Sequence, residues 1–231
     1  MSQNWIDLLF AHWKVPEATL RAFVPHQLKI DCYEGDAYVG VVPFRMSKVK
    51  PRGLPPVEFL SEFLELNVRT YVTVDGRPGV YFFSLDASNP VAVQIARAWY
   101  HLPYFKAQMT LTEQMSPTTD DKNWIEYCST RSDGNGINNF KASYRPITPV
   151  ELSQPDSIEA FLTERYCLYV LDSKNRVCRG DIHHRQWQLQ KAEARFEVNT
   201  MGSQYGFDFS QAPVLHFSKY IETIEWPIKA I

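Results

Sequence analysis

Alternation of polar and apolar residues is the strongest pattern in this chain. It is clearest over residues 65–74, ELNVRTYVTV, which lead into Asp75-Gly76-Arg77-Pro78 and return over residues 79–85. A period of two is typical of a β-strand, and Asp-Gly is a strong turn signal. The pattern therefore predicts an antiparallel hairpin with a four-residue turn.

Shorter alternating stretches bounded by turn residues predict many more strands. We expect strands at residues 28–32, 37–42, 104–112, 124–131, 139–145, 166–172, 176–184, 192–198 and 214–226. Short helices are expected at residues 16–24, from Pro90 to just before Pro103, and at residues 156–162 with Asp156 as the N-cap, and a loop is expected at residues 48–56. Many antiparallel strands with a few short helices indicate an α+β fold that is mostly antiparallel β and shaped as a barrel. Since no repeat or linker divides the chain, we expect residues 1–231 to form a single domain.

Composition and charge do not indicate a nucleic-acid-binding, membrane or disulfide-rich protein. The apolar fraction of 45% suffices for a sizeable core, and a net charge of −2 does not indicate a nucleic-acid partner. The sequence shows neither a signal peptide nor an apolar run of about 18 residues, so no membrane association is predicted. The four cysteines are widely spaced and predict reduced thiols rather than a disulfide framework. The expected compartment is the cytoplasm, and homo-oligomer formation is left open.

The first candidate site lies on the predicted strand at residues 65–74. Because side chains alternate, Glu65, Asn67, Arg69 and Tyr71 share one face. If this face lines a barrel interior, Arg69 can grip an anion and Glu65 can act as an acid or base. The alternative is a solvated sheet face with a weak Glu–Arg ion pair.

The predicted hairpin adds polar groups to this face. With a four-residue turn, Arg69 should lie opposite Ser84 and Asn67 opposite Asp86. We therefore expect both strands to contribute to one polar wall.

Two further segments contain residue types that can carry covalent or metal chemistry. Lys106 follows Tyr104 on a predicted strand face and would be a nucleophile if its pKa were lowered, although a lone lysine is usually an ordinary surface residue. His183 and His184 are adjacent on a strand and point to opposite faces, so they cannot ligate one metal ion together. No metal site and no cofactor are predicted.

Eight segments, taken in order, carry a resemblance to a known family. They are residues 8–25, 36–46, 65–72, 76–87, 102–109, 161–169, 182–193 and 213–226, including LLFAHWKVPEATLRAFVP, ELNVRTYV and IHHRQWQLQKAE. Together they resemble the YqjF-like family of uncharacterised bacterial proteins, which is related in fold to acetoacetate decarboxylase. The resemblance implies a closed, mostly antiparallel barrel with a central pocket, and the Glu65 face directed inward.

The same resemblance implies a mechanism from which this sequence departs. Acetoacetate decarboxylase uses two tandem lysines after a proline, the first forming an imine and the second lowering its pKa, an effect for which that enzyme is the standard example. Here Tyr104 and Phe105 occupy those positions and Lys106 follows, displaced by about 7 Å along the strand. The resemblance still implies a catalytic role for Glu65, with Tyr104 and Lys106 as catalytic candidates.

The candidate substrate-binding residues are Arg69, Asn67, Arg21 and Tyr81. Three functions remain open: an enzyme acting on a small oxo- or hydroxy-carboxylate, a binding protein for a small anionic molecule, and a scaffold whose interior is filled by side chains. Clustered polar groups favour the first two, because unpaired buried charge is costly.

Overall fold

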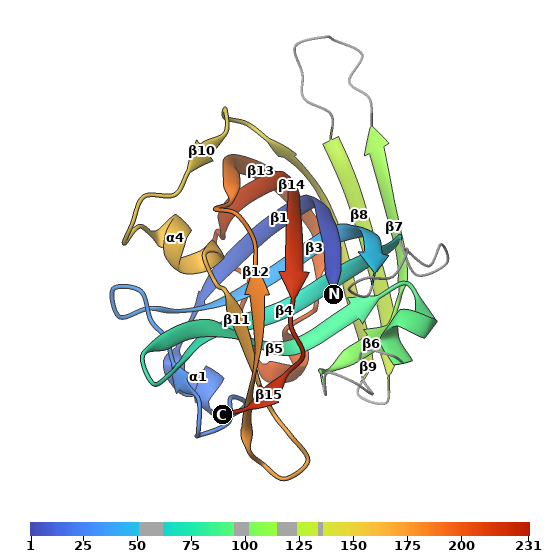
Figure 1. The fold of residues 1–231 in the computed structure, drawn as a ribbon. Helices are drawn as coiled ribbons and strands as arrows, with labels where there is room; N and C mark the ends of the chain where they lie inside the picture. Colours follow the sequence, from blue (N-terminus) through green and yellow to red (C-terminus); the bar gives the residue numbers. More distant parts are fainter. Residues whose placement is uncertain (51–61, 95–101, 115–123, 134–135) are drawn as a thin grey trace.

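The computed structural model describes residues 1–50, 62–94, 102–114, 124–133 and 136–231 (Figure 1). Its elements are β1 Ser2–Val15, α1 Glu17–Arg21, β2 Lys29–Ile30, β3 Ala37–Lys50, β4 Phe63–Val74, β5 Arg77–Ala87, β6 Tyr104–Lys106, β7 Gln108–Gln114, β8 Trp124–Asp133, β9 Gly136–Pro146, β10 Glu151–Leu152, α4 Ile158–Thr163, β11 Cys167–Leu171, β12 Val177–His183, β13 Gln188–Asn199, η1 Ser203–Tyr205, β14 Val214–Glu225 and β15 Lys229–Ala230. A further helical stretch covers residues 90–94.

Seven of the described strands close into a ring. The pairing order is β12, β11, β5, β4, β3, β1 and β14, and β14 returns to β12. The closure is uneven: β12 meets β14 through two residue pairs, and β11 meets β5 in parallel through one pair, Leu168 with Val80. The α+β, mostly antiparallel prediction is therefore confirmed, although the ring is less regular than an even barrel.

A second layer covers the outside of this ring. Strands β13, β9, β8 and β7 continue from β14 in this order, and Figure 1 shows β9, β8 and β7 on the side of the molecule away from α4. The largest hydrophobic cluster joins Leu66 and Val68 of β4 to Tyr127 of β8 and Phe140 of β9. This layer buries the outer face of the central strands, which explains why β4 is buried on both faces.

The N-terminal segment is a strand that the sequence analysis did not predict. β1 pairs with β14 on one side and β3 on the other, so it belongs to the ring itself. The strand bends at Asp7, whose φ is 57°. The Asp7 carboxylate forms ion pairs with Arg45 at 3.0 Å and with Lys219 at 2.6 Å. Because of this bend, the residues of β1 do not alternate regularly between polar and apolar, and the sequence pattern did not predict a strand here.

The predicted hairpin is confirmed, but its turn is shorter than expected. Val74 pairs with Arg77, so only Asp75 and Gly76 form the turn, with φ values of 49° and 75°. Positive φ at both positions is the reason that Asp-Gly suits a two-residue turn.

Other predicted boundaries also shift. β3 runs on to Lys50, so the start of the predicted loop at residues 48–56 is strand and the rest lies outside the described residues. The predicted strand at residues 104–112 is divided into β6 and β7, and most of the predicted helix after Pro90 lies outside the described residues. The N-cap of α4 is Ser157, whose Oγ accepts from the Ala160 amide, and not Asp156.

Candidate functional site

The face of β4 that carries Glu65, Asn67, Arg69 and Tyr71 is directed into the ring. Their exposed fractions are 2%, 5%, 7% and 0%. The neighbouring positions of β3 on this face are Phe44, Val42, Gly40 and Tyr38. The alternative of a solvated sheet face does not describe this strand, and the hydrophobic alternation of β4 instead separates a polar interior row from an apolar outer row.

Arg69 is the most unusual member of this row. One guanidinium nitrogen, Nη2, donates to the carbonyl oxygen of Leu162 at 3.3 Å. The guanidinium carbon lies 5.4 Å from the Phe10 ring centroid and 5.8 Å from that of Tyr71. Its Nε has no hydrogen-bond partner among the described residues.

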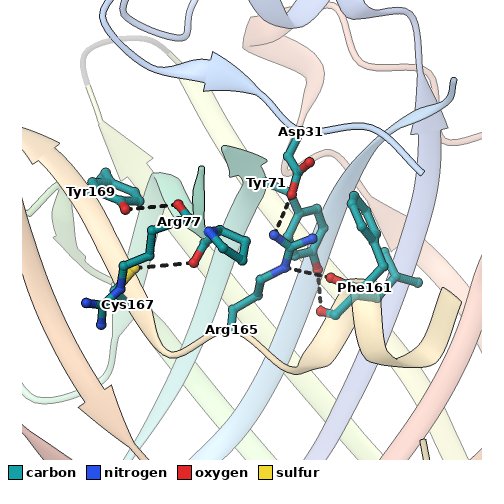
Figure 2. Close-up of polar contacts among 9 residues, drawn as sticks. Asp31, Tyr71, Arg77, Phe161, Arg165, Cys167 and Tyr169 are labelled. Atoms are coloured by element: carbon teal, nitrogen blue, oxygen red, sulfur yellow. Dashed lines mark hydrogen bonds and ion pairs between the residues drawn. The ribbon is translucent and has the colours of Figure 1, made fainter. Parts of the chain in front are cut away.

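The environment of Arg69 differs from that of Arg131 and Arg165, which are also buried. Arg131 pairs with Asp86 at 2.8 Å, and Arg165 pairs with Asp31 at 2.6 Å. Figure 2 shows the second pair beside the ring of Tyr71. Within the described parts of the chain, Arg69 has no such carboxylate. Burying a charge without a counter-charge is costly, and within the described chain Arg69 is buried in this way.

His12 of β1 lies beside Arg69, with Gly40 of β3 between them. A Cβ atom at Gly40 would come within 2.8 Å of His12 Cδ2 and 3.5 Å of Arg69 Cγ. A glycine is therefore required for the imidazole to rest on β3. His12 Nε2 lies 2.6 Å from the Tyr71 hydroxyl, and burial, followed by the charge of Arg69, lowers the pKa of His12 well below its usual value.

A second polar cluster surrounds Glu65. Tyr104 Oη donates to Glu65 Oε2 at 3.1 Å. Burial raises the pKa of Glu65 to about 8, the hydrogen bond from Tyr104 opposes this rise, and the carboxyl groups of Glu225 and Asp86 add to it. Burial also raises the pKa of Glu225 to about 7. With a pKa of about 8, the carboxyl group of Glu65 is mostly neutral at pH 7 and is suited to proton transfer near neutral pH.

The two clusters are separate along β4. Glu65 and Arg69 are four positions apart, which corresponds to about 13 Å between their Cα atoms along a strand. The guanidinium of Arg69 also turns toward Leu162 and Tyr71, on the side away from Glu65. The structure therefore does not place these two side chains in one clamp.

The predicted register of the hairpin is wrong, with consequences for the polar wall. Asn67 lies opposite Leu85 rather than Asp86, and Arg69 lies opposite Phe82 rather than Ser84. The shorter turn moves the register, and a bulge between Val68 and Arg69 moves it again. Asp86 consequently faces the outer layer, where it pairs with Arg131.

Arg21 is the candidate whose contacts are entirely local. Its guanidinium donates to the carbonyl oxygens of Val24, Pro25 and Leu28 at 2.8 to 3.0 Å. These bonds close the C-terminal end of α1 and the turn after it. None of these three hydrogen bonds joins Arg21 to a residue of the β4 row.

Tyr81 and Lys106 also lie apart from the interior row. Tyr81 pairs with Thr70, so it shares the outer face of the hairpin and packs on Phe83 with ring centroids 5.5 Å apart. Lys106 is exposed at the end of β6. His12 was not among the predicted site residues, because its partners come from strands far away in the sequence.

Comparison with known proteins places the whole chain in one family. The family model DUF2071, described as an uncharacterized conserved protein, matches residues 2–222. The chain belongs to the DUF2071 family. A member from Bacillus subtilis strain 168, the uncharacterized protein YqjF, is 42% identical over 230 residues, covering 99% of this chain and 91% of the relative.

Solved structures show that this DUF2071 protein has an acetoacetate decarboxylase-like fold. The enduracididine biosynthesis enzyme MppR complexed with pyruvate aligns with a TM-score of 0.66 at 12% identity, covering 99% of this chain and 89% of that one. A structure of acetoacetate decarboxylase aligns at 0.62 and 15% identity, covering 100% and 88%. The acetoacetate decarboxylase of Legionella pneumophila aligns at 0.62 and 12% identity, covering 100% and 86%. At these identities the likeness concerns the fold alone.

The described residues contain neither a membrane-spanning helix nor a cluster of metal ligands. No helix among them is long and apolar enough to cross a membrane. Across the same residues, no three His, Cys, Asp or Glu side chains are grouped as metal ligands would be. The four cysteines are free thiols, two of them buried.

Proposed function

We propose that the ring interior binds a small oxo- or hydroxy-carboxylate, with Arg69 as the anion-binding residue. The observation that carries this proposal is the burial of Arg69 without a carboxylate partner in the described chain, where Arg131 and Arg165 each have one. A guanidinium can hold a carboxylate through two parallel hydrogen bonds. Asn67, two residues away on the same face, supplies a further polar group.

The fold relationship supports the choice of ligand class. The structural neighbour MppR was solved with pyruvate, a small oxo acid. The lysine positions that the resemblance to acetoacetate decarboxylase implies are occupied here by Tyr104 and Phe105. The proposal therefore concerns binding of the acid and does not require an imine.

The test is titration calorimetry with pyruvate, lactate and longer oxo acids. We expect Arg69→Met to weaken binding at least about tenfold, since the ligand loses its charge partner. Arg195→Met is the matched control, because this arginine is 72% exposed and should not affect binding. The proposal fails if no acid in the panel binds, or if Arg69→Met binds as well as the wild type.

A second candidate function, acid–base catalysis, is favoured by the Glu65–Tyr104 pair. A carboxyl group with a pKa of about 8 exists in both protonation states near neutral pH. Its carboxylate could take a proton from the carbon beside a ligand carbonyl, giving an enolate, and the resulting carboxylic acid could return it. Because Glu65 and Arg69 are about 13 Å apart along the strand, this reaction suits an acid longer than pyruvate.

Exchange of ligand carbon-bound protons for deuterium tests this second function. We expect the wild type to accelerate exchange in deuterated water for an oxo acid of suitable length, with a rate that rises with pH through about 8. Glu65→Gln should abolish the acceleration, and Glu113→Gln, on the exposed side of β7, should retain it. Equal rates in the wild type and Glu65→Gln would exclude Glu65 as the base.

A further inference from the structure

The hydrogen bonds around His12 determine which of its two ring nitrogens carries the proton. Tyr71 Oη lies 2.8 Å from the carbonyl oxygen of Leu162 and 2.6 Å from His12 Nε2. A carbonyl oxygen can only accept, so the single hydroxyl proton of Tyr71 goes to Leu162. His12 Nε2 must then carry a proton and donate it to the Tyr71 oxygen.

This assignment leaves the other nitrogen as an acceptor. The imidazole is neutral in this buried position, so Nδ1 carries a lone pair. His12 is 1% exposed, and Nδ1 has no hydrogen-bond partner among the described residues. Buried polar atoms without a partner are uncommon in folded proteins.

Two other unpaired atoms lie on the same interior face. Arg69 Nε is a donor, and Asn67 Oδ1 is an acceptor in the assigned amide orientation. Together with His12 Nδ1 they present one charged donor and two acceptors. A ligand that carries only acceptors, such as an oxo acid, would satisfy Arg69 and leave both acceptors unpaired.

We propose that this protein selects hydroxy acids over the corresponding oxo acids, and that His12 is the specificity-determining residue. The carboxylate of the ligand meets Arg69, and its hydroxyl donates to His12 Nδ1. Tyr71 and Leu162 are positioning groups, because they hold the proton on Nε2 and keep Nδ1 free to accept. This inference rests on the proposed carboxylate site and names its substrate class as 2-hydroxy carboxylates.

Three matched ligands test the preference by calorimetry: lactate, pyruvate, and propionate, which lacks both oxygen functions at the second carbon. We expect lactate to bind the wild type at least about tenfold more tightly than pyruvate, because pyruvate leaves a buried acceptor unpaired. Tyr71→Phe removes the group that fixes the imidazole proton on Nε2. His12 can then donate from Nδ1, and we expect the preference for lactate to disappear or to reverse toward pyruvate.

Two measurements keep the inference testable if Tyr71→Phe fails to fold. His12→Phe should bind lactate no better than propionate. In the unmodified protein, nitrogen NMR of the His12 ring should show Nε2 protonated and Nδ1 not.

The outcomes separate this inference from the proposed function. If pyruvate binds the wild type as tightly as lactate or more tightly, or if Nδ1 carries the proton, the inference is overturned and the carboxylate site stands. If only the longer oxo acids bind, the inference is overturned and the carboxylate site stands. If neither these acids nor the three matched ligands bind, the carboxylate site itself fails and the inference fails with it. A preference for lactate that persists unchanged in Tyr71→Phe and in His12→Phe would assign the selectivity to another residue and overturn the role of His12.

Discussion

Replacing Glu65 with glutamine should change how the stability of the protein depends on pH. Glu65 is 2% exposed, and burial raises its pKa to about 8 from an ordinary value of 4.5. The only hydrogen bond that the structure gives its carboxyl oxygens comes from Tyr104, at 3.1 Å, among the described residues. Glutamine has nearly the same shape and cannot ionise.

The sign follows from the difference in proton binding between the two states. Between pH 4.5 and about 8, the unfolded chain releases the Glu65 proton while the folded chain retains it. The contribution of the protonated Glu65 to the free energy of unfolding is therefore fully present below pH 4.5 and is lost as the pH rises through about 8. Glu225, whose pKa is raised to about 7, contributes with the same sign.

The magnitude follows from the size of the pKa change. Each unit of difference between folded and unfolded pKa corresponds to about 1.4 kcal/mol, so Glu65 accounts for at most about 5 kcal/mol across this range. Local relaxation around the carboxylate reduces this figure, and we expect a loss of about 2 to 4 kcal/mol. In Glu65→Gln this part of the pH dependence should be absent, and the part due to Glu225 should remain.

Urea unfolding followed by tryptophan fluorescence measures the effect at pH values from about 5 to about 9. The free energy of unfolding of the wild type should fall over this range more steeply than that of Glu65→Gln. Glu113→Gln, an exposed position, should follow the wild type. Parallel curves for the wild type and Glu65→Gln would refute the assignment of a buried, proton-retaining carboxyl group to this position.

Three further predictions concern Arg69, the contact between Gly40 and His12, and the exposed Lys106. Without ligand, Arg69→Met should leave the melting temperature unchanged or raise it, whereas Arg131→Met should lower the stability by about 3 to 5 kcal/mol because it removes the ion-pair partner of the buried Asp86. Thermal unfolding of both variants would contradict this reasoning if Arg69→Met were the more damaging. Gly40→Ala should destabilise the protein by about 1 to 3 kcal/mol, since the added Cβ would overlap the imidazole of His12. In a double-mutant cycle, His12→Ala should remove most of this penalty, and additive effects of the two substitutions would argue against the overlap. Because Lys106 is exposed, borohydride treatment with oxo acids should give no trapped adduct by intact mass, and an adduct that is lost in Lys106→Ala would restore this lysine as a nucleophile.

Local sequence signals were sufficient for many elements of this fold. Asp75-Gly76 determined a hairpin because few dipeptides accept positive φ at two successive positions. The alternation over residues 65–74 determined that Glu65, Asn67, Arg69 and Tyr71 share a face, since this follows from strand geometry alone. The alternation did not reveal the bulge that shifts the pairing register by one residue.

Only the tertiary structure decided which face is enclosed and what each polar group meets there. Ring closure through β12 and β14 surrounds the Glu65 face, and the layer of β13, β9, β8 and β7 covers the opposite one. Burial then raises the pKa of Glu65, and the fold brings a carboxylate to Arg131 and Arg165 but none from the described chain to Arg69. These properties depend on residues distant in sequence, such as His12 on β1 across Gly40, and strand periodicity carries no information about such neighbours.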